Sequence, residues 1–284
     1  MQEFLFVVTE KFNNYAVGDF LSKQGVSDEI ITKVKFGGVY VNDVVLNNIN
    51  TKISLGDKVK MVLPIDKLNH FISPKKGDLK VLYEDEYVLA VDKESGVLAH
   101  SSKHNKTVSL EELVCGYFLP REFTFRAINR LDKDTSGIVL IAKDTYTACL
   151  LNKQMKDGQI KKTYSAIVVG VPKTQRFVIE KNIKRENDFS IKRVCATDGK
   201  YAKTECNLVK VLDGNLSVID CFMHTGRTHQ IRVHLSSVGL PLYADSLYGE
   251  RVVGKSFNLH AKVLEFIHPF SNKKIRLESL PKWL

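Results

Sequence analysis

The chain has 284 residues, 44% of them hydrophobic, which suits one large domain and one small domain with real cores. Its formal net charge of +10 favours an anionic partner, most simply nucleic acid. Five cysteines without a C-x-x-C pair argue against a disulfide framework and a zinc site, and no apolar run is long enough to span a bilayer. The first residues lack the basic start and long apolar core of a secretory signal, so we expect a soluble, cytoplasmic protein without a membrane partner.

The pattern over residues 1–63 predicts a small α/β unit. The stretch AVGDFLSKQ has helical spacing and stops at Gly25, and DEIITKVKF predicts a second helix with Ser27 as its N-cap. GVYVNDVVL predicts a hairpin with an Asn-Asp turn, and LGDKVKMVL predicts a turn and a strand. The unit contains seven lysines and seven acidic residues, so the whole excess of +10 belongs to the rest of the chain.

Three lysines of this small unit are candidates for RNA contact. Lys23, Lys33 and Lys35 lie on or beside the two predicted helices and are close enough in sequence to form one patch. A solvated helix face explains the same pattern equally well.

Residues 64–78 have the composition of a linker, with two prolines and mixed polar character. The remaining residues, 79–284, predict a strand-rich α+β domain whose sheet is mixed and mostly antiparallel. The expected helices are TVSLEELVCGYFL and TYTACLLNKQMKDG; the expected strands are LKVLYE, YVLAVDK, SGIVLIAK, TYSAIVVG, NIKRENDFSIKRVC, YAKTECNLVKVL and NLSVIDCFM.

The stretch INRLDKDTSGIVLIAK places two carboxylates, Asp132 and Asp134, in a turn that leads into a buried strand. DKDTSG matches the first half of a calcium-binding loop, but the twelfth position, which needs a bidentate Glu, is Lys143. A plain solvated turn remains open. Because a core strand anchors this turn, it is also a suitable place for a functional carboxylate, with Arg130 beside it.

The stretch HTGRTHQIRVHLSSVGLP predicts a helix with Thr228 as its N-cap, since apolar residues recur at helical spacing. Arg227 then lies at the positive end of the helix dipole, where it needs an anion, either a carboxylate or a phosphate. An exposed Arg paired with water is the alternative. The five-residue spacing of the three histidines in this stretch argues against a metal site.

Six motifs occur together and in order: RLDKDTSG, YSAIVVG, GKYAKTE, TGRTHQIRVHL, LYG and LHAKVLEFIHP. The set resembles the RluA-type pseudouridine synthases, which isomerise uridine in ribosomal and transfer RNA. GGVYVND and LGDKV resemble the alpha-L RNA-binding motif first described in a small-subunit ribosomal protein. The resemblance implies a pseudouridine synthase fold with a central cleft, preceded by an alpha-L RNA-binding domain.

The resemblance also implies the site residues. Asp132 is the expected catalytic aspartate, Arg227 its buried ion-pair partner, and Tyr164 the aromatic side chain that contacts the target base. Arg130 is expected to fill the gap that the flipped uridine leaves. The family usually has His before Arg-Leu-Asp, where this chain has Asn129, so the substrate contact of that His is not carried over. Without the resemblance, Tyr164 is equally well an ordinary core tyrosine.

The implied reaction breaks the N1–C1′ bond of uridine, rotates the base and rejoins it through C5, so it needs no cofactor and no metal. The expected partner is RNA, with ribosomal RNA favoured over transfer RNA, and a monomer is the default. Two other hypotheses stay open: a non-catalytic RNA-binding or ribosome-assembly factor, and a metal-dependent phosphodiesterase that uses Asp132 and Asp134.

Overall fold

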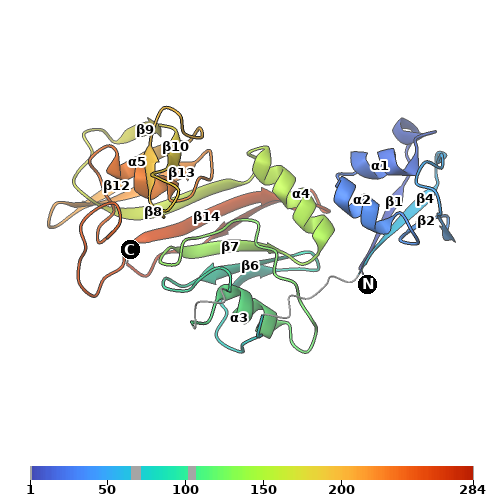
Figure 1. The fold of residues 1–284 in the computed structure, drawn as a ribbon, viewed down its shortest axis with the longest axis horizontal. Coiled ribbons are helices and arrows are strands. Elements are labelled where there is room, and N and C mark those ends of the chain that lie inside the picture. The colour runs from blue at the N-terminus through green and yellow to red at the C-terminus, as the bar shows by residue number, and fades with distance from the viewer. Residues whose placement is uncertain (1, 65–71, 102–106, 284) are drawn as a thin grey trace.

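The computed structural model describes residues 2–64, 72–101 and 107–283. These residues form a four-stranded sheet, a two-stranded ribbon and a nine-stranded sheet (Figure 1). Residues 65–71 of the predicted linker lie outside the described ranges. None of the helices in those ranges has the length and apolar character needed to cross a bilayer.

The N-terminal unit is a sheet with strand order β1-β4-β2-β3 and two short α-helices. The side chain of Ser27 accepts a hydrogen bond from the backbone N–H of Ile30 at 3.4 Å, which confirms the predicted N-cap. Asn42 and Asp43 both have positive φ, 50° and 65°, which confirms the predicted hairpin turn. The elements are β1 (Gln2–Val7), η1 (Glu10–Phe12), α1 (Val17–Lys23), α2 (Asp28–Val34), β2 (Val39–Val41), β3 (Val44–Val45) and β4 (Lys58–Leu63).

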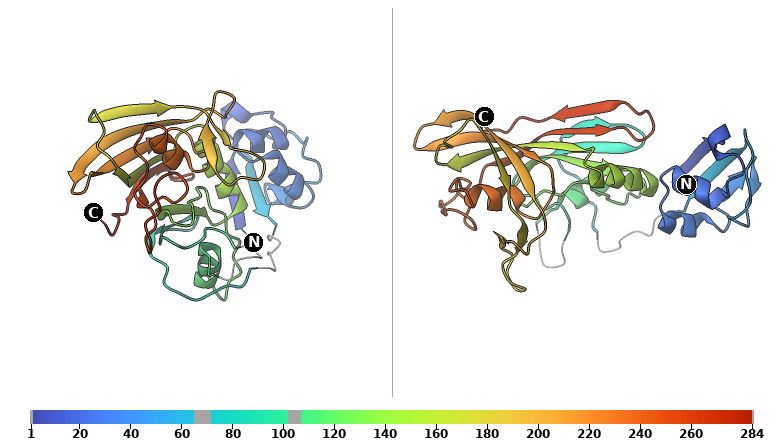
Figure 2. Two further views of the ribbon diagram at one scale, coloured as in Figure 1. Left: turned by 60° about the vertical axis from the view of Figure 1, so that its left-hand side comes forward. Right: turned by 90° about the horizontal axis from the view of Figure 1, so that it is seen from above.

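The large sheet has the order β5-β6-β7-β14-β8-β13-β12-β9, with β15 paired to β14. In the described residues, β14 with β7 is the parallel pair of strands and the other pairs are antiparallel, which confirms a mixed, mostly antiparallel sheet. Helices α3, α4 and α5 lie on one side of this sheet (Figure 2, right). The elements are β5 (Val81–Glu84), β6 (Val88–Lys93), α3 (Leu110–Tyr117), β7 (Ser136–Ala142), α4 (Thr145–Lys156), β8 (Lys161–Val169), β9 (Arg176–Glu180), β10 (Ile183–Arg185), β11 (Arg193–Cys195), β12 (Lys203–Leu212), β13 (Leu216–Met223), α5 (Gln230–Ser236), β14 (Leu259–Ile267) and β15 (Lys274–Glu278).

The position of β14 determines how the large sheet is joined. This strand lies between β7 and β8, so it connects the half of the sheet that begins at β5 to the half that ends at β9. The parallel contact pairs His260 with Ser136 and Ala261 with Gly137. A Cβ at Gly137 would lie 2.4 Å from the carbonyl oxygen of Ala261, and the φ of Gly137 is +109°, so this close approach requires glycine.

The N-terminal unit lies beside α4 (Figure 1), and an aromatic side chain of α4 makes the contact. Tyr146 of α4 is 2% exposed, and it belongs to the same hydrophobic cluster as the core of the N-terminal unit. Its hydroxyl donates a hydrogen bond to the carbonyl of Gln24 at 2.8 Å, and its ring meets that of Phe4 edge-on at 4.9 Å. The two units are therefore in direct, buried contact.

Candidate active site

Asp132 lies in a tight turn at the start of β7. The backbone N–H of Thr135 donates to the carbonyl of Asp132 at 3.1 Å, which closes the turn. The hydroxyl of Ser136 and Nδ1 of the buried His260 are 2.8 Å apart, which ties the base of the turn to β14. The carboxyl group is thus presented from the end of a buried strand, as a rigid scaffold presents a functional group.

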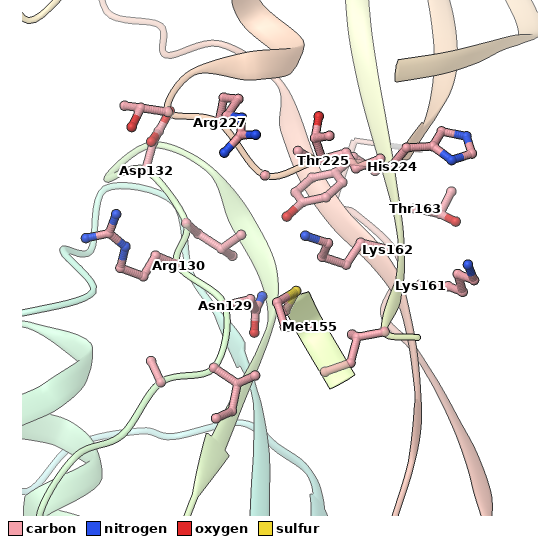
Figure 3. Close-up of a pocket in the computed structure, with 18 of the residues that line it drawn as sticks. Asn129, Arg130, Asp132, Met155, Lys161, Lys162, Thr163, His224, Thr225 and Arg227 are labelled. Carbon is pink, nitrogen blue, oxygen red and sulfur yellow. The ribbon is translucent and has the colours of Figure 1, made fainter. Parts of the chain in front are cut away.

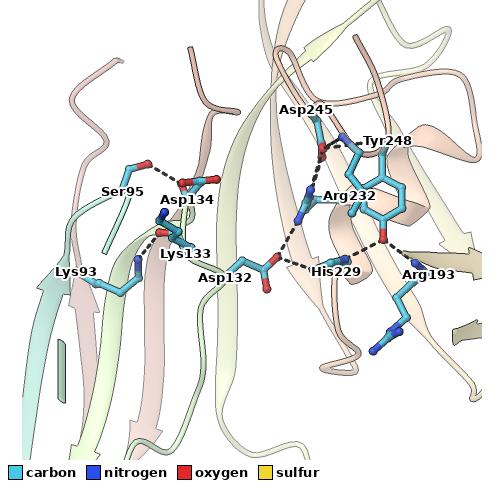
Figure 4. A network of polar contacts seen from close by, with 11 residues as sticks. Lys93, Ser95, Asp132, Lys133, Asp134, Arg193, His229, Arg232, Asp245 and Tyr248 are labelled. Atoms are coloured by element: carbon cyan, nitrogen blue, oxygen red, sulfur yellow. Dashed lines mark hydrogen bonds and ion pairs between the residues drawn. The ribbon is translucent and has the colours of Figure 1, made fainter. Parts of the chain in front are cut away.

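A buried lysine holds the other side of this turn (Figure 4). Lys93 is 2% exposed, and its ammonium donates to the carbonyls of Lys133, Val97 and Glu94 at 2.9, 2.8 and 2.9 Å. Burial lowers the pKa of Lys93 to about 8. The hydroxyl of Ser95 also donates to the carbonyl of Asp134 at 2.8 Å. The loop after β6 therefore clamps the backbone of the Asp132 turn.

Asn129, which precedes Arg-Leu-Asp in the chain, is turned onto the sheet. It is 6% exposed; its Nδ2 donates to the carbonyl of Ile138 at 2.9 Å, and its Oδ1 accepts from the N–H of Leu140 at 2.8 Å. Both bonds go to backbone groups of β7. The side chain of Asn129 therefore aligns the segment before Asp132 with the strand that follows it.

The ion-pair partner of Asp132 is Arg232, on α5. Nη1 of Arg232 lies 3.3 Å from Oδ2 of Asp132. The same guanidinium donates from Nε and Nη2 to the two oxygens of Asp245, at 2.7 and 2.8 Å, and it lies 4.3 Å from the centroid of the Phe257 ring. Asp245 is fully buried and Arg232 is 7% exposed. Arg232 is therefore held in place by Asp245 and faces Asp132 (Figure 4).

The predicted pair of Asp132 with Arg227 is wrong in this structure, because the guanidinium of Arg227 is held elsewhere. α5 begins at Gln230, with His229 as its N-cap in a left-handed conformation at φ 56°, one residue later than the predicted N-cap Thr228. Arg227 lies in the exposed turn before the helix, where its Nε donates to the carbonyl of Tyr201 at 2.9 Å. Arg232 lies on the buried helix, so its guanidinium reaches Asp132 instead.

His229 is the second group beside Asp132 that can carry a positive charge. Its Nε2 lies 3.7 Å from Oδ2 of Asp132, and its Nδ1 lies 2.8 Å from the hydroxyl of Tyr248. Burial lowers the pKa of His229, which favours the neutral imidazole. In the described ranges no three His, Cys, Asp or Glu side chains gather as a group that could hold a metal ion.

Tyr164 projects from β8 and lines the same cleft as Asp132. It is 6% exposed, and burial, together with the charge of Asp132, raises the pKa of its hydroxyl. The hydroxyl therefore keeps its proton, and the ring supplies an apolar face.

The cleft between these groups has a volume of about 1260 Å³ (Figure 3). Arg130, Asp132, Tyr164 and Arg227, four residues predicted for the site, line it together with Lys162. Basic groups and one central carboxylate thus share a cavity that is large enough for a nucleotide and its neighbours.

The other predicted RNA-binding residues are not in this cleft. Lys33 pairs with Glu29 at 2.6 Å, the ammonium of Lys35 lies 4.9 Å from the centroid of the Phe36 ring, and Lys23 ends α1. All three belong to the N-terminal unit, so any RNA contact they make is separate from the cleft.

Sequence reasoning missed Arg232 and Lys93. A signal existed for each: Arg232 stands between Ile231 and Val233 in a helix whose apolar residues predict burial, and Lys93 ends an apolar strand. A charged residue in such a setting is buried and needs partners.

Residues 87–237 match the family described as RNA pseudouridylate synthase. The chain is 31% identical over 271 residues to the protein named uncharacterized RNA pseudouridine synthase YjbO of Bacillus subtilis (strain 168), covering 93% of this chain and 94% of that one. It is 32% identical over 291 residues to ribosomal large subunit pseudouridine synthase C of Buchnera aphidicola subsp. Baizongia pistaciae, covering 94% and 90%. The solved structure of human RNA pseudouridylate synthase domain containing 1 is similar, with a TM-score of 0.60, 25% identity, and coverage of 74% of this chain and 87% of that one.

Proposed function

The chain belongs to the RNA pseudouridylate synthase family, and on that premise we propose that Asp132 isomerises a uridine of large-subunit ribosomal RNA to pseudouridine. The uridine-to-pseudouridine activity follows from the family. The choice of ribosomal RNA is supported by the names of relatives such as ribosomal large subunit pseudouridine synthases C and D. Transfer RNA is the second candidate substrate.

One observation carries the role of Asp132: it is a carboxylate in the cleft with a buried Arg232 at 3.3 Å, and Tyr164 lines the same cavity. The reaction needs an ionised carboxylate beside the junction of sugar and base, and Arg232 supplies the opposite charge. Such a carboxylate can attack as a nucleophile or remove a proton from the ribose, and this geometry serves both routes.

Base access is the next requirement. A stacked uridine is out of reach, so the base is flipped into the cleft at a cost of a few kcal/mol. Tyr164 offers it a stacking face, and Arg130, which is exposed on the cleft wall, fills the space left in the RNA.

The domain roles are part of the same proposal. Residues 1–63 act as an alpha-L RNA-binding domain in which Lys23, Lys33 and Lys35 contact RNA; residues 64–78 are a linker, and residues 79–284 are the catalytic domain. The enzyme works as a monomer in the cytoplasm, without a cofactor. The basic excess of residues 64–284 supports RNA binding by the catalytic domain itself.

Tritium release tests the role of Asp132. RNA labelled with tritium at C5 of uridine is incubated with the protein without added metal, and release is measured together with RNA affinity. Asp132→Asn should abolish release and keep affinity. Asp134→Asn is the matched control, because Asp134 lines a different cavity on the other side of the turn and should retain activity.

Three other outcomes have distinct meanings. Release that persists in Asp132→Asn removes Asp132 from catalysis. RNA binding without release in the wild type indicates a ribosome-assembly factor, and strand cleavage indicates a phosphodiesterase. Mapping pseudouridine in ribosomal and transfer RNA from cells that lack the protein identifies the substrate.

A further inference from the structure

Lys162 lines the cleft, and its ammonium has no anionic partner among the described residues. It precedes Tyr164 by two residues on β8, and residues two apart in a strand project from the same face. Figure 3 shows the side chains of Lys162 and Lys161, which both line the cleft, on opposite sides of β8, with Lys162 on the side that faces Arg130 and Asp132. In the described part of the chain, no hydrogen bond or ion pair reaches the ammonium of Lys162. Burial, which no neighbouring carboxylate offsets, lowers its pKa.

Three of the four carboxylates that line the cleft are already engaged, and the fourth, Asp157, does not raise the pKa of Lys162. Glu205 pairs with His224 at 2.9 Å, Glu265 pairs with Lys274 at 2.6 Å, and Asp132 faces Arg232. By contrast Lys262, on the neighbouring strand β14, has its own carboxylate, Asp220, at 3.0 Å. The structure thus leaves a desolvated positive charge uncompensated at Lys162, which costs stability unless a ligand supplies the anion.

Arg227 is the second cation at this position. A Cβ built on Gly226 would lie 3.4 Å from Nζ of Lys162, so the ammonium lies beside the turn that carries Arg227. Nε of Arg227 is fixed by the carbonyl of Tyr201 at 2.9 Å. Among the described residues its two terminal nitrogens have no hydrogen-bond partner, which leaves the outer edge of the guanidinium free for an anion.

We propose that Lys162 and Arg227 together form a binding site for one backbone phosphate of the RNA, next to the flipped nucleotide. This inference rests on the proposed function, because it takes RNA as the ligand. A phosphate supplies the missing negative charge to both groups, and its oxygens accept from the ammonium and from the free edge of the guanidinium. Arg227 thus binds the substrate, while Arg232 pairs with Asp132.

The test compares Lys162→Met and Arg227→Met with Lys161→Met. Lys161 is the adjacent, exposed residue whose ammonium donates to the carbonyl of Gly158 at 2.9 Å, so it is the matched control. Affinity for a uridine-containing RNA is measured over a range of salt concentrations, together with kcat at saturating RNA and a thermal melt of each variant. Lys162→Arg keeps the charge and should restore affinity.

Each of Lys162→Met and Arg227→Met should weaken binding about 10- to 100-fold and reduce the slope of log affinity against log salt by about 0.7–0.9. Values of kcat at saturating RNA should stay close to wild type, and Lys161→Met should change the slope little. If both Met variants keep the wild-type slope of log affinity against log salt, the proposed phosphate site is contradicted. A loss of kcat at saturation with unchanged affinity would also overturn it, because it would place these residues in the reaction step.

The binding measurement needs no turnover. If the wild type releases no tritium while the two variants still lose salt dependence, the proposed function fails and the phosphate site stands. If the wild type releases tritium and the two variants bind RNA like the wild type, the proposed function stands and the phosphate site fails.

Discussion

At the scale of single residues, Arg232 does two tasks with one guanidinium. Two of its nitrogens bind the fully buried Asp245, and the third faces Asp132. Removing a buried partner leaves a charge uncompensated, which costs more than the pair contributes. With the proposed role of Asp132, we therefore expect Arg232 to affect both stability and activity.

Arg232→Met should lower the free energy of unfolding by about 3–5 kcal/mol and reduce kcat by about 10²–10³-fold. Arg232→Lys should restore little of the lost stability or activity, because a lysine cannot bind Asp245 with two parallel hydrogen bonds. Urea unfolding and tritium release measure the two effects. Arg276→Met, which breaks an exposed pair with Glu278, is the control and should change stability by less than about 1 kcal/mol. Normal kcat in Arg232→Met would contradict a role for the pair with Asp132.

Two of the predicted site residues lie in one cleft. A small-residue turn before an apolar strand makes Asp132 a candidate, and the resemblance adds Tyr164; both line the cleft, and their catalytic roles stay predictions. The partner of Asp132 is harder to predict, because two arginines, Arg227 and Arg232, lie close together in sequence. Contacts far away in the chain fix their side chains: Asp245 holds Arg232, and the carbonyl of Tyr201 holds Arg227.

At the scale of elements, the loop after β6 and the turn before β7 behave as one unit. Lys93 holds three carbonyl groups, one of them in the Asp132 turn. This is a long-range contact between two loops, and it sets the position of Asp132, the proposed catalytic residue, without touching its side chain.

Lys93→Met should therefore reduce kcat about 10-fold or more with little change in RNA affinity, because small misplacements of a catalytic group slow the reaction strongly. Tritium release at saturating RNA measures kcat, and RNA binding is measured separately. Lys80→Met removes an exposed lysine that pairs with Asp92 and is the control. A variant that loses RNA affinity but keeps kcat would show that Lys93 acts on binding.

Local patterns predicted local elements well. The Ser27 cap and the Asn42–Asp43 turn depend on neighbouring residues alone, and both were found as expected. β14 and β1 were not assigned as strands, because each is defined by partners far away in the chain: β14 by β7 and β8, and β1 by β4. Strand pairing of this kind is a tertiary property that the pattern of one segment does not contain.

At the scale of the whole molecule, Tyr146 joins the two units. Tyr146→Ala should destabilise the contact between the two units by about 3–5 kcal/mol and release the N-terminal unit from α4. Small-angle scattering should then give a larger radius of gyration. Tyr146→Phe is the matched control, since it loses only the hydrogen bond to Gln24, worth about 1 kcal/mol, and should stay compact. An unchanged radius in Tyr146→Ala would mean that other contacts suffice.

Stability should also depend on pH. Burial lowers the pKa of His229, His234 and His260 below the ordinary value of 6.5. As the pH falls below 6.5, these histidines bind protons in the unfolded chain before they do so in the folded protein. Their contribution to the free energy of unfolding is therefore fully present above pH 6.5 and is lost progressively below it. Urea midpoints should decrease from about pH 7.5 to about pH 6. His260→Gln should show a weaker decrease, and an equal decrease would contradict the assignment.

The central place of β14 has a consequence for how the protein is made. Asp132 precedes β7 and Tyr164 lies on β8, and the strand between β7 and β8 in the sheet is β14, which comes much later in the chain, at residues 259–267. A growing chain on the ribosome therefore has both halves of the sheet with unpaired inner edges, and no assembled cleft, until residues 259–267 have been synthesised. Until then, the segments that carry Asp132 and Tyr164 are not joined in one sheet.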